Sequence, residues 1–131
     1  AGSNLKKVAM GPIKAQLSDD GQYIYIEGKP NTLCSSTLTM DKAFENLLNW
    51  LTSDMVGIWY RNHKACSFEQ SLIMAAKACS MSAADLMGLK AGKITEDAAA
   101  DICVLDIVRG ENRINVKVAK TIVNGQIVFS I

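Results

Sequence analysis

The sequence predicts an α+β protein from three patterns. Near the C-terminus, two runs rich in Val and Ile are separated by Asn124-Gly125, a strong hairpin signal because a type I′ turn needs positive φ at both central residues. Alternating apolar and polar residues predict a second hairpin over about 11–27. Apolar residues spaced three and four apart predict two to three helices packed with the hairpins or small sheet of 11–27 and 101–131, at about 40–52, 67–80 and 82–88.

Length and composition indicate a single domain over residues 1–131. The chain has 131 residues and is 49% hydrophobic, which is ample for a core. Its net charge is only +1 and its sequence contains no basic stripe, so we expect no nucleic-acid partner. No apolar run approaches the ~20 residues of a membrane span, so we expect no membrane partner. Four cysteines without a Cys-x-x-Cys pair predict a reduced, cytoplasmic protein.

The N-terminal third begins with a strand pattern over 11–17 and a turn at 18–21. The next strand, 22–27, places Tyr23 and Tyr25 on one face and the isoleucines between and after them on the other. Gly28 to Asn31 breaks this strand. We expect a polar, hydroxyl-rich loop over 32–39 that ends with Thr39 as the N-cap of the first helix.

The helices carry recognisable ends and apolar faces. Ser67 and Gln70 form a capping-box pattern at the start of the second helix, and Ser82 and Asp85 repeat it for a short third helix that stops at Gly88. Alanines in the second helix predict close approach to a neighbouring element. The apolar face of the first helix consists of Met40, Ala43, Phe44, Leu47, Leu48 and Leu51, and that of the second of Phe68, Leu72, Ala75, Ala76 and Cys79.

The irregular segment 53–64 contains aromatic residues, an arginine and the single histidine, His63. It is either a surface connection or a contact surface, since aromatics and arginine are enriched at interface centres. A catalytic zinc normally takes three protein ligands, and Cys66 adds at most one to His63, so we expect no metal. Cysteine chemistry, with His63 as base and Cys66 or Cys34 as nucleophile, is an alternative that lacks a predicted orienting residue.

Several motifs occur in a characteristic order. They are 35–41 (Ser-Ser-Thr-Leu-Thr-Met-Asp), 46–48 (Asn-Leu-Leu), the alanine-rich 75–89 ending in Leu-Met-Gly-Leu, 92–94 (Gly-Lys-Ile), 100–106 (Ala-Asp-Ile-Cys-Val-Leu-Asp) and 120–125 (Lys-Thr-Ile-Val-Asn-Gly). Together they resemble the C-terminal part of the amidohydrolase superfamily, most closely N-acetylglucosamine-6-phosphate deacetylase. The resemblance covers about 22–131.

The resemblance implies a fold, an activity and a site. It places the end of a (β/α)₈ barrel over 1–90 and strands of a β-sandwich over 101–131. The family is a metal-dependent hydrolase of the acetamide bond, and its substrate contacts fall on Leu33, Cys34 and Ser35, which makes a sugar phosphate the expected ligand. The family's catalytic aspartate stretch has its nearest match at 7–10, where no carboxylate occurs. With one histidine in the chain, we expect no catalytic residue, metal or cofactor in this polypeptide.

Two functions follow from these observations. The first is a C-terminal fragment or stand-alone relative of an amino-sugar deacetylase that is not catalytic as this chain alone. The alternative is a non-enzymatic binding or homo-oligomerisation module, a homodimer being the simplest form, that associates through 53–64 or through exposed sheet edges.

Overall fold

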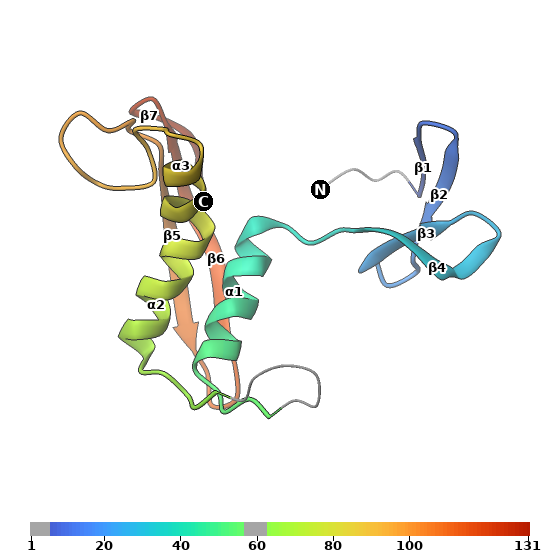
Figure 1. Cartoon of the computed structure of the whole chain (residues 1–131), viewed down its shortest axis with the longest axis horizontal. Coiled ribbons are helices and arrows are strands. Elements are labelled where there is room, and N and C mark those ends of the chain that lie inside the picture. The colour runs from blue at the N-terminus through green and yellow to red at the C-terminus, as the bar shows by residue number, and fades with distance from the viewer. Residues whose placement is uncertain (1–5, 57–62) are drawn as a thin grey trace. The chain divides into compact units, whose positions relative to one another are not determined.

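The computed structural model describes residues 6–56 and 63–131, which form two antiparallel sheets with helices (Figure 1). The predicted α+β class is confirmed. The chain divides into two compact units, Ala1–Thr39 and Met40–Ile131. The single domain expected over 1–131 stays a prediction.

The Ala1–Thr39 unit is a four-stranded antiparallel meander. It contains β1 (Lys7–Met10), β2 (Ile13–Leu17), β3 (Tyr23–Ile26) and β4 (Lys29–Ser36), in that spatial order. The hairpin predicted over 11–27 is confirmed as β2 and β3. The Tyr23 and Tyr25 rings lie 6.2 Å apart between centroids, as expected for residues on one face. Ser18 holds the turn, because its hydroxyl oxygen accepts from the N–H groups of Gln22 and Tyr23, both at 3.1 Å.

The prediction of a loop over 32–39 is wrong as far as Ser36, because β4 continues to that residue. The serine and threonine residues of this segment form no local sequence pattern that distinguishes a strand from a polar loop. Pairing with β3 therefore decides the backbone conformation of the segment. The ladder is irregular, with register shifts on both sides of Tyr25. β1, which the sequence analysis does not predict, pairs with β2 across a turn in which Gly11 has a φ of 61°.

The predicted helices are confirmed in the Met40–Ile131 unit. They are α1 (Met40–Leu51) and α2 (Phe68–Ala76), the latter continuing through a π-helical turn, η1 (Lys77–Met81), into α3 (Ser82–Leu86). The capping box at Ser67 and Gln70 is present, with both hydrogen bonds at 3.2 Å. The capping box predicted at Ser82 is wrong. Ser82 has helical dihedrals and its N–H donates to the Lys77 carbonyl, because the π turn carries the helix through this point.

The helix ends as the sequence predicts, with Gly88 at C′. Gly88 has a φ of 67°, and its N–H donates to the Asp85 carbonyl at 3.2 Å. The Leu89 N–H donates to the Ala84 carbonyl at 2.9 Å. These two bonds form a Schellman motif, which satisfies carbonyls at the helix end.

The second sheet has three antiparallel strands, β5 (Ile102–Arg109), β6 (Ile114–Val123) and β7 (Gln126–Ser130), in chain order. The Asn124-Gly125 hairpin is confirmed, with φ of 49° and 76° at the two residues. The turn is tied back to the start of β5, because the Asn124 N–H donates to Asp101 Oδ1 at 2.8 Å and the Gly125 N–H to the Ala100 carbonyl at 3.0 Å.

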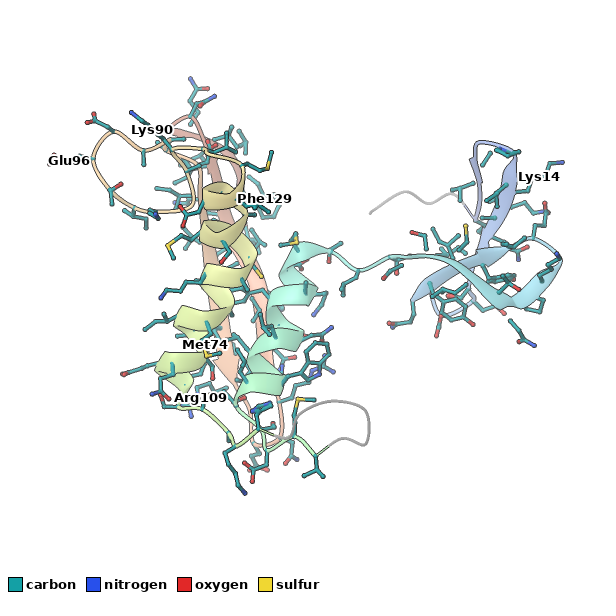
Figure 2. All side chains as sticks on the ribbon, in the orientation of Figure 1. Lys14, Met74, Lys90, Glu96, Arg109 and Phe129 are labelled. Carbon is teal, nitrogen blue, oxygen red and sulfur yellow. The ribbon has the colours of Figure 1, made fainter. Side chains whose placement is uncertain are left out.

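Helices α1 and α2 pack on one face of this sheet (Figure 1). The core there consists of buried Leu48, Ala75, Ile114 and Val116, with half-buried Phe44, Leu47, Phe68, Leu72, Leu105 and Ile107 packed against it. At the edge of this core, the guanidinium carbon of Arg109 lies 4.7 Å from the centroid of the Phe68 ring (Figure 2). Among the described residues, no helix is long and apolar enough to cross a membrane.

A buried carboxylate also joins α1 to β6. Glu45 is 1% exposed and accepts from Lys42 Nζ at 2.9 Å, from Arg113 Nη2 at 2.9 Å and from the Val116 N–H at 2.8 Å. Burial raises the pKa of this carboxyl, but the donors from Lys42, Val116 and Arg113 outweigh burial, so the pKa lies below the ordinary 4.5. Glu45 is not part of the apolar face that the helical spacing predicts for α1. The carboxylate can be buried because these three donors satisfy it.

Candidate functional site

The Met40–Ile131 unit contains an apolar groove of about 980 Å³. Its floor is formed by β5 and β6, and its walls by the start of α1, by α2 with η1, and by the segment 92–101. We call it the α1–η1 groove. It is lined by Met40, Asp41, Phe44, Ile73, Ala76, Lys77, Cys79, Ser80, Met81, Gly92, Lys93, Ile94, Thr95, Ala98, Ala99, Ala100, Asp101, Ile102, Cys103, Leu105 and Val118.

One wall of the groove depends on close backbone packing at Gly92. A Cβ at this position would lie 2.9 Å from Met81 Cα and 3.1 Å from Met81 N, which no side chain can accommodate. Gly92 also has a φ of 74°, a region that favours glycine. The segment 92–101 therefore begins directly against the π turn, at Gly92, and π turns occur frequently at functional sites.

Two charged side chains at the groove have partners within the protein. Lys93 Nζ donates to Asp85 Oδ1 at 3.0 Å, and Asp101 accepts from the Asn124 N–H. Cys79 is half-buried, and burial raises the pKa of its thiol, which disfavours the nucleophilic thiolate. The groove therefore offers an apolar binding surface and no arrangement of acid, base and nucleophile among the described residues.

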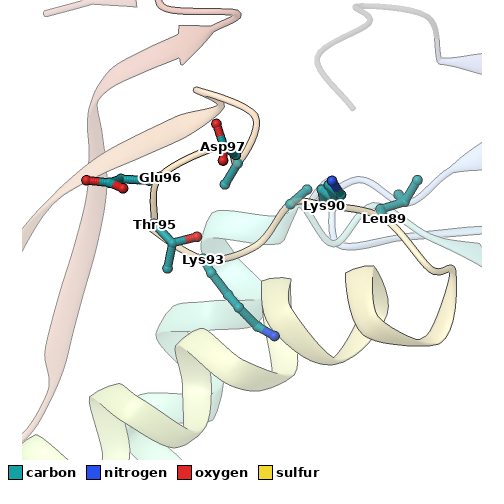
Figure 3. Close-up of a pocket in the computed structure, with 8 residues that line it drawn as sticks. Leu89, Lys90, Lys93, Thr95, Glu96 and Asp97 are labelled. Carbon is teal, nitrogen blue, oxygen red and sulfur yellow. The ribbon is translucent and has the colours of Figure 1, made fainter.

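A smaller pocket of about 330 Å³ lies within the loop 89–98 (Figure 3). Lys93 extends from this loop toward the helix, where it meets Asp85 of α3. Asp97 has a φ of 62°, and the loop closes with a hydrogen bond from the Ala99 N–H to the Lys90 carbonyl at 3.1 Å. Two basic side chains, Lys90 and Lys93, and two acidic ones, Glu96 and Asp97, line the pocket, so it shows no preference for a charged ligand.

The predicted substrate-binding residues lie together on β4. Leu33 pairs with Tyr25 and is 68% exposed, whereas Cys34 and Ser35 are half-buried. The hydroxyl of Ser35 donates to the Ser36 carbonyl at 3.4 Å. These residues belong to the Ala1–Thr39 unit and the groove to the other unit, so their role in binding a sugar phosphate stays a prediction.

The described part of the segment 53–64 forms a small backbone bridge. Met55 and His63 exchange two backbone hydrogen bonds, at 3.0 and 3.1 Å, and the Asp54 carboxylate accepts from Lys64 Nζ at 3.2 Å. Residues 57–62, which carry most of the predicted contact surface, lie outside the described residues. In the described ranges no three side chains of His, Cys, Asp or Glu form a group that could hold a metal. The expectation of no metal stays a prediction.

Sequence reasoning missed the groove. The alanines of α2 and the apolar faces of the helices predict residues that pack in the core. The structure places two of these residues, Ala76 and Cys79, at the groove instead. Met40 belongs to the predicted apolar face of α1, yet it lines the groove and is 63% exposed. No local pattern marks such positions, because a residue facing a groove has the same spacing as a residue facing the core.

Comparison with models of protein families, with curated proteins and with solved structures finds no match for this chain. The resemblance to amino-sugar deacetylases therefore rests on the sequence motifs.

Proposed function

We propose that this chain is a C-terminal fragment or stand-alone relative of an amino-sugar deacetylase of the amidohydrolase superfamily. In the full-length family the reaction is hydrolysis of the acetamide bond of N-acetylglucosamine 6-phosphate. This chain alone is not catalytic in the proposal, and it acts in the cytoplasm.

The observation that carries the proposal is the convergence of separate motifs on the α1–η1 groove. Four of the motif segments that carry the resemblance, 35–41, 75–89, 92–94 and 100–106, each contribute residues to its lining. The first segment lies far from the other three in the sequence, the other three follow one another closely, and all four share one apolar surface. This supports the interpretation that the motifs belong to one structural unit that packs against further apolar groups, as a fragment of a larger fold would.

The described residues do not offer a donor set for the divalent metal of the family, so no catalytic step is assigned to this chain. What it would contribute is substrate contact from β4. Leu33 is exposed and can pack on the apolar face of a sugar ring, and the Ser35 hydroxyl can hydrogen-bond to a phosphate or hydroxyl oxygen. Cys34 lies between them and would fix their spacing on the strand.

The test combines binding with chemistry on the purified chain. Amide resonances of Leu33, Cys34 and Ser35 are followed by NMR during titration with N-acetylglucosamine 6-phosphate, with inorganic phosphate as the control. The proposal expects shifts at these residues with the sugar phosphate, no release of free amine and no bound zinc. Stoichiometric zinc with turnover would contradict the non-catalytic role.

A second observation tests the family itself. The coding sequence upstream of Ala1 would contain histidine-rich barrel strands if the chain is part of a deacetylase. Absence of such strands, together with absence of sugar-phosphate binding, would overturn the deacetylase proposal.

The second candidate function is a homo-oligomerisation module. It is favoured by large apolar side chains that remain exposed at the C-terminal strand, among them Ile127 at 60%, Val128 at 62% and Ile131 at 84%. Light scattering across a concentration series tests it, and a monomer at the highest concentration would count against it.

A further inference from the structure

The edge strands of the two sheets differ in how they are protected from pairing. Among the described residues the edges are β1, β4, β5 and β7. Charged side chains and proline on an edge oppose pairing with another strand. β1 carries Lys7, β4 carries Lys29 and Pro30, and β5 carries Asp106 and Arg109. β7 carries neither a charge nor a proline.

β7 also has the composition of a strand that pairs readily. Its sequence is Gln-Ile-Val-Phe-Ser, followed by Ile131, and all five strand residues are exposed. Segments of this length with high β propensity, no charge and no Pro or Gly are the ones that associate edge to edge. Within the described residues the only strand that pairs with β7 is β6, so its other edge is unpaired.

We propose that β7 pairs antiparallel with β7 of a second copy of this chain, joining two three-stranded sheets into one continuous sheet. This interface deepens the second candidate function, the oligomerisation module, and does not depend on the deacetylase proposal.

A second copy suits this edge for reasons of charge and symmetry. Antiparallel pairing of β7 with its copy brings Val128 opposite Val128, and Ile127 opposite Phe129, when the two-fold axis passes through the middle of the strand, so no like charges meet. Antiparallel pairing of one strand with its own copy is isologous, and it closes around a two-fold axis. The opposite edge of the sheet, β5, keeps its charges, so the assembly stops at two copies instead of growing into a fibre.

The size of the edge predicts the strength of the dimer. β7 has five residues, so the interface is short and the association should be weak and concentration-dependent. The joined sheet would contain the three strands of each copy, which lies within the usual size of an open sheet.

The structure provides a matched pair of variants. Val128 on β7 and Val108 on β5 are the same residue type, are 62% and 63% exposed, and lie on opposite edge strands of one sheet. In the proposed dimer, Val128→Lys brings two like charges to the new strand pair, whereas Val108→Lys adds a charge to the edge that stays free. Sedimentation equilibrium of the full chain should show that V128K weakens association by about a hundredfold or more, while V108K leaves it unchanged.

Hydrogen exchange of the unmodified chain provides a readout that does not depend on variant folding. In the proposed dimer, amide exchange at Gln126–Ser130 slows as concentration rises, while exchange at Ile102–Arg109 does not. A monomer at every concentration overturns both the interface and the oligomerisation module. A dimer that V128K leaves intact, or one that V108K dissociates, overturns the interface alone, as does assembly into particles larger than a dimer.

Discussion

The side-chain amide of Asn49 hydrogen-bonds to both backbone groups of Ile114. Its Nδ2 donates to the Ile114 carbonyl at 2.8 Å, and its Oδ1 accepts from the Ile114 N–H at 2.9 Å. Asn49 lies in the last turn of α1 and Ile114 is the first residue of β6. Ile114 also pairs with Arg109 of β5, so the Asn49 amide joins α1 to a residue that belongs to the sheet, and it fixes the helix against that sheet.

Replacing Asn49 by alanine should destabilise the Met40–Ile131 unit by about 2 kcal/mol, because two backbone groups of a buried residue lose their partners. Urea unfolding followed by circular dichroism at the helix band measures this, since α1 and α2 lie in that unit. Asn46→Ala is the control, because half-buried Asn46 makes no such bond to the described residues. Equal stability of the two variants would contradict the role of Asn49.

Protonation of Glu45 should make the same unit sensitive to acid. Its pKa is lower in the folded state than the ordinary 4.5, so the stability that it contributes is present above that pH and is lost as pH falls through the folded pKa. Glu45→Gln should cost about 2 kcal/mol at neutral pH, because the buried Val116 N–H and the exposed cations of Lys42 and Arg113 lose a charged acceptor. It should also flatten the loss of stability below pH 4.5.

The measurement for Glu45 is the urea midpoint of each protein over a pH series. Glu69→Gln, a change at an exposed position in the first turn of α2, is the control and should keep the acid dependence of the unmodified chain. A Glu45→Gln variant that kept the full acid dependence would show that other carboxyls cause it.

Alanine at Gly92 should be far more damaging than alanine at Gly88. Both glycines have positive φ, at 74° and 67°, so both substitutions carry the backbone penalty of about 1 kcal/mol. Only at Gly92 would the new Cβ lie 2.9 Å from the Met81 backbone, whereas nothing lies within 4 Å at Gly88. Thermal unfolding should therefore show a clearly larger drop in Tm for G92A, and similar values for both would mean that the close approach is unimportant.

The thiol of Cys79 should react slowly with alkylating agents at neutral pH. Burial raises its pKa above the ordinary 9.0, and the thiolate is the reactive form. The pH profile of iodoacetamide labelling, measured by mass spectrometry, should shift to higher pH in the folded chain than in the chain unfolded by urea. A profile at lower pH would indicate a nearby cation and would contradict this prediction.

Several elements could be predicted because their signals are local. The Asn124-Gly125 turn, the capping box of Ser67 and Gln70, and the glycine end at Gly88 each depend on residues within one turn of each other. The spacing of apolar residues was sufficient to predict α1 and α2, since apolar residues recur on the same face at every helical turn. The α+β class followed from these elements.

Other features required partners far along the chain. Glu45 is buried because Arg113 and Val116, which are 68 and 71 residues away, supply its donors. Two further features depend on the neighbouring element: β4 is a strand because β3 pairs with it, and Ser82 continues a helix because the π turn precedes it.

The sequence by itself determined the helices of this protein and the hairpins β2–β3 and β6–β7, because the energies of turns and caps act between neighbouring residues. The tertiary structure alone decided that segments 40–44, 73–81 and 92–105 surround one apolar groove and that β7 is the edge without a charge, because both depend on which strands and helices lie side by side.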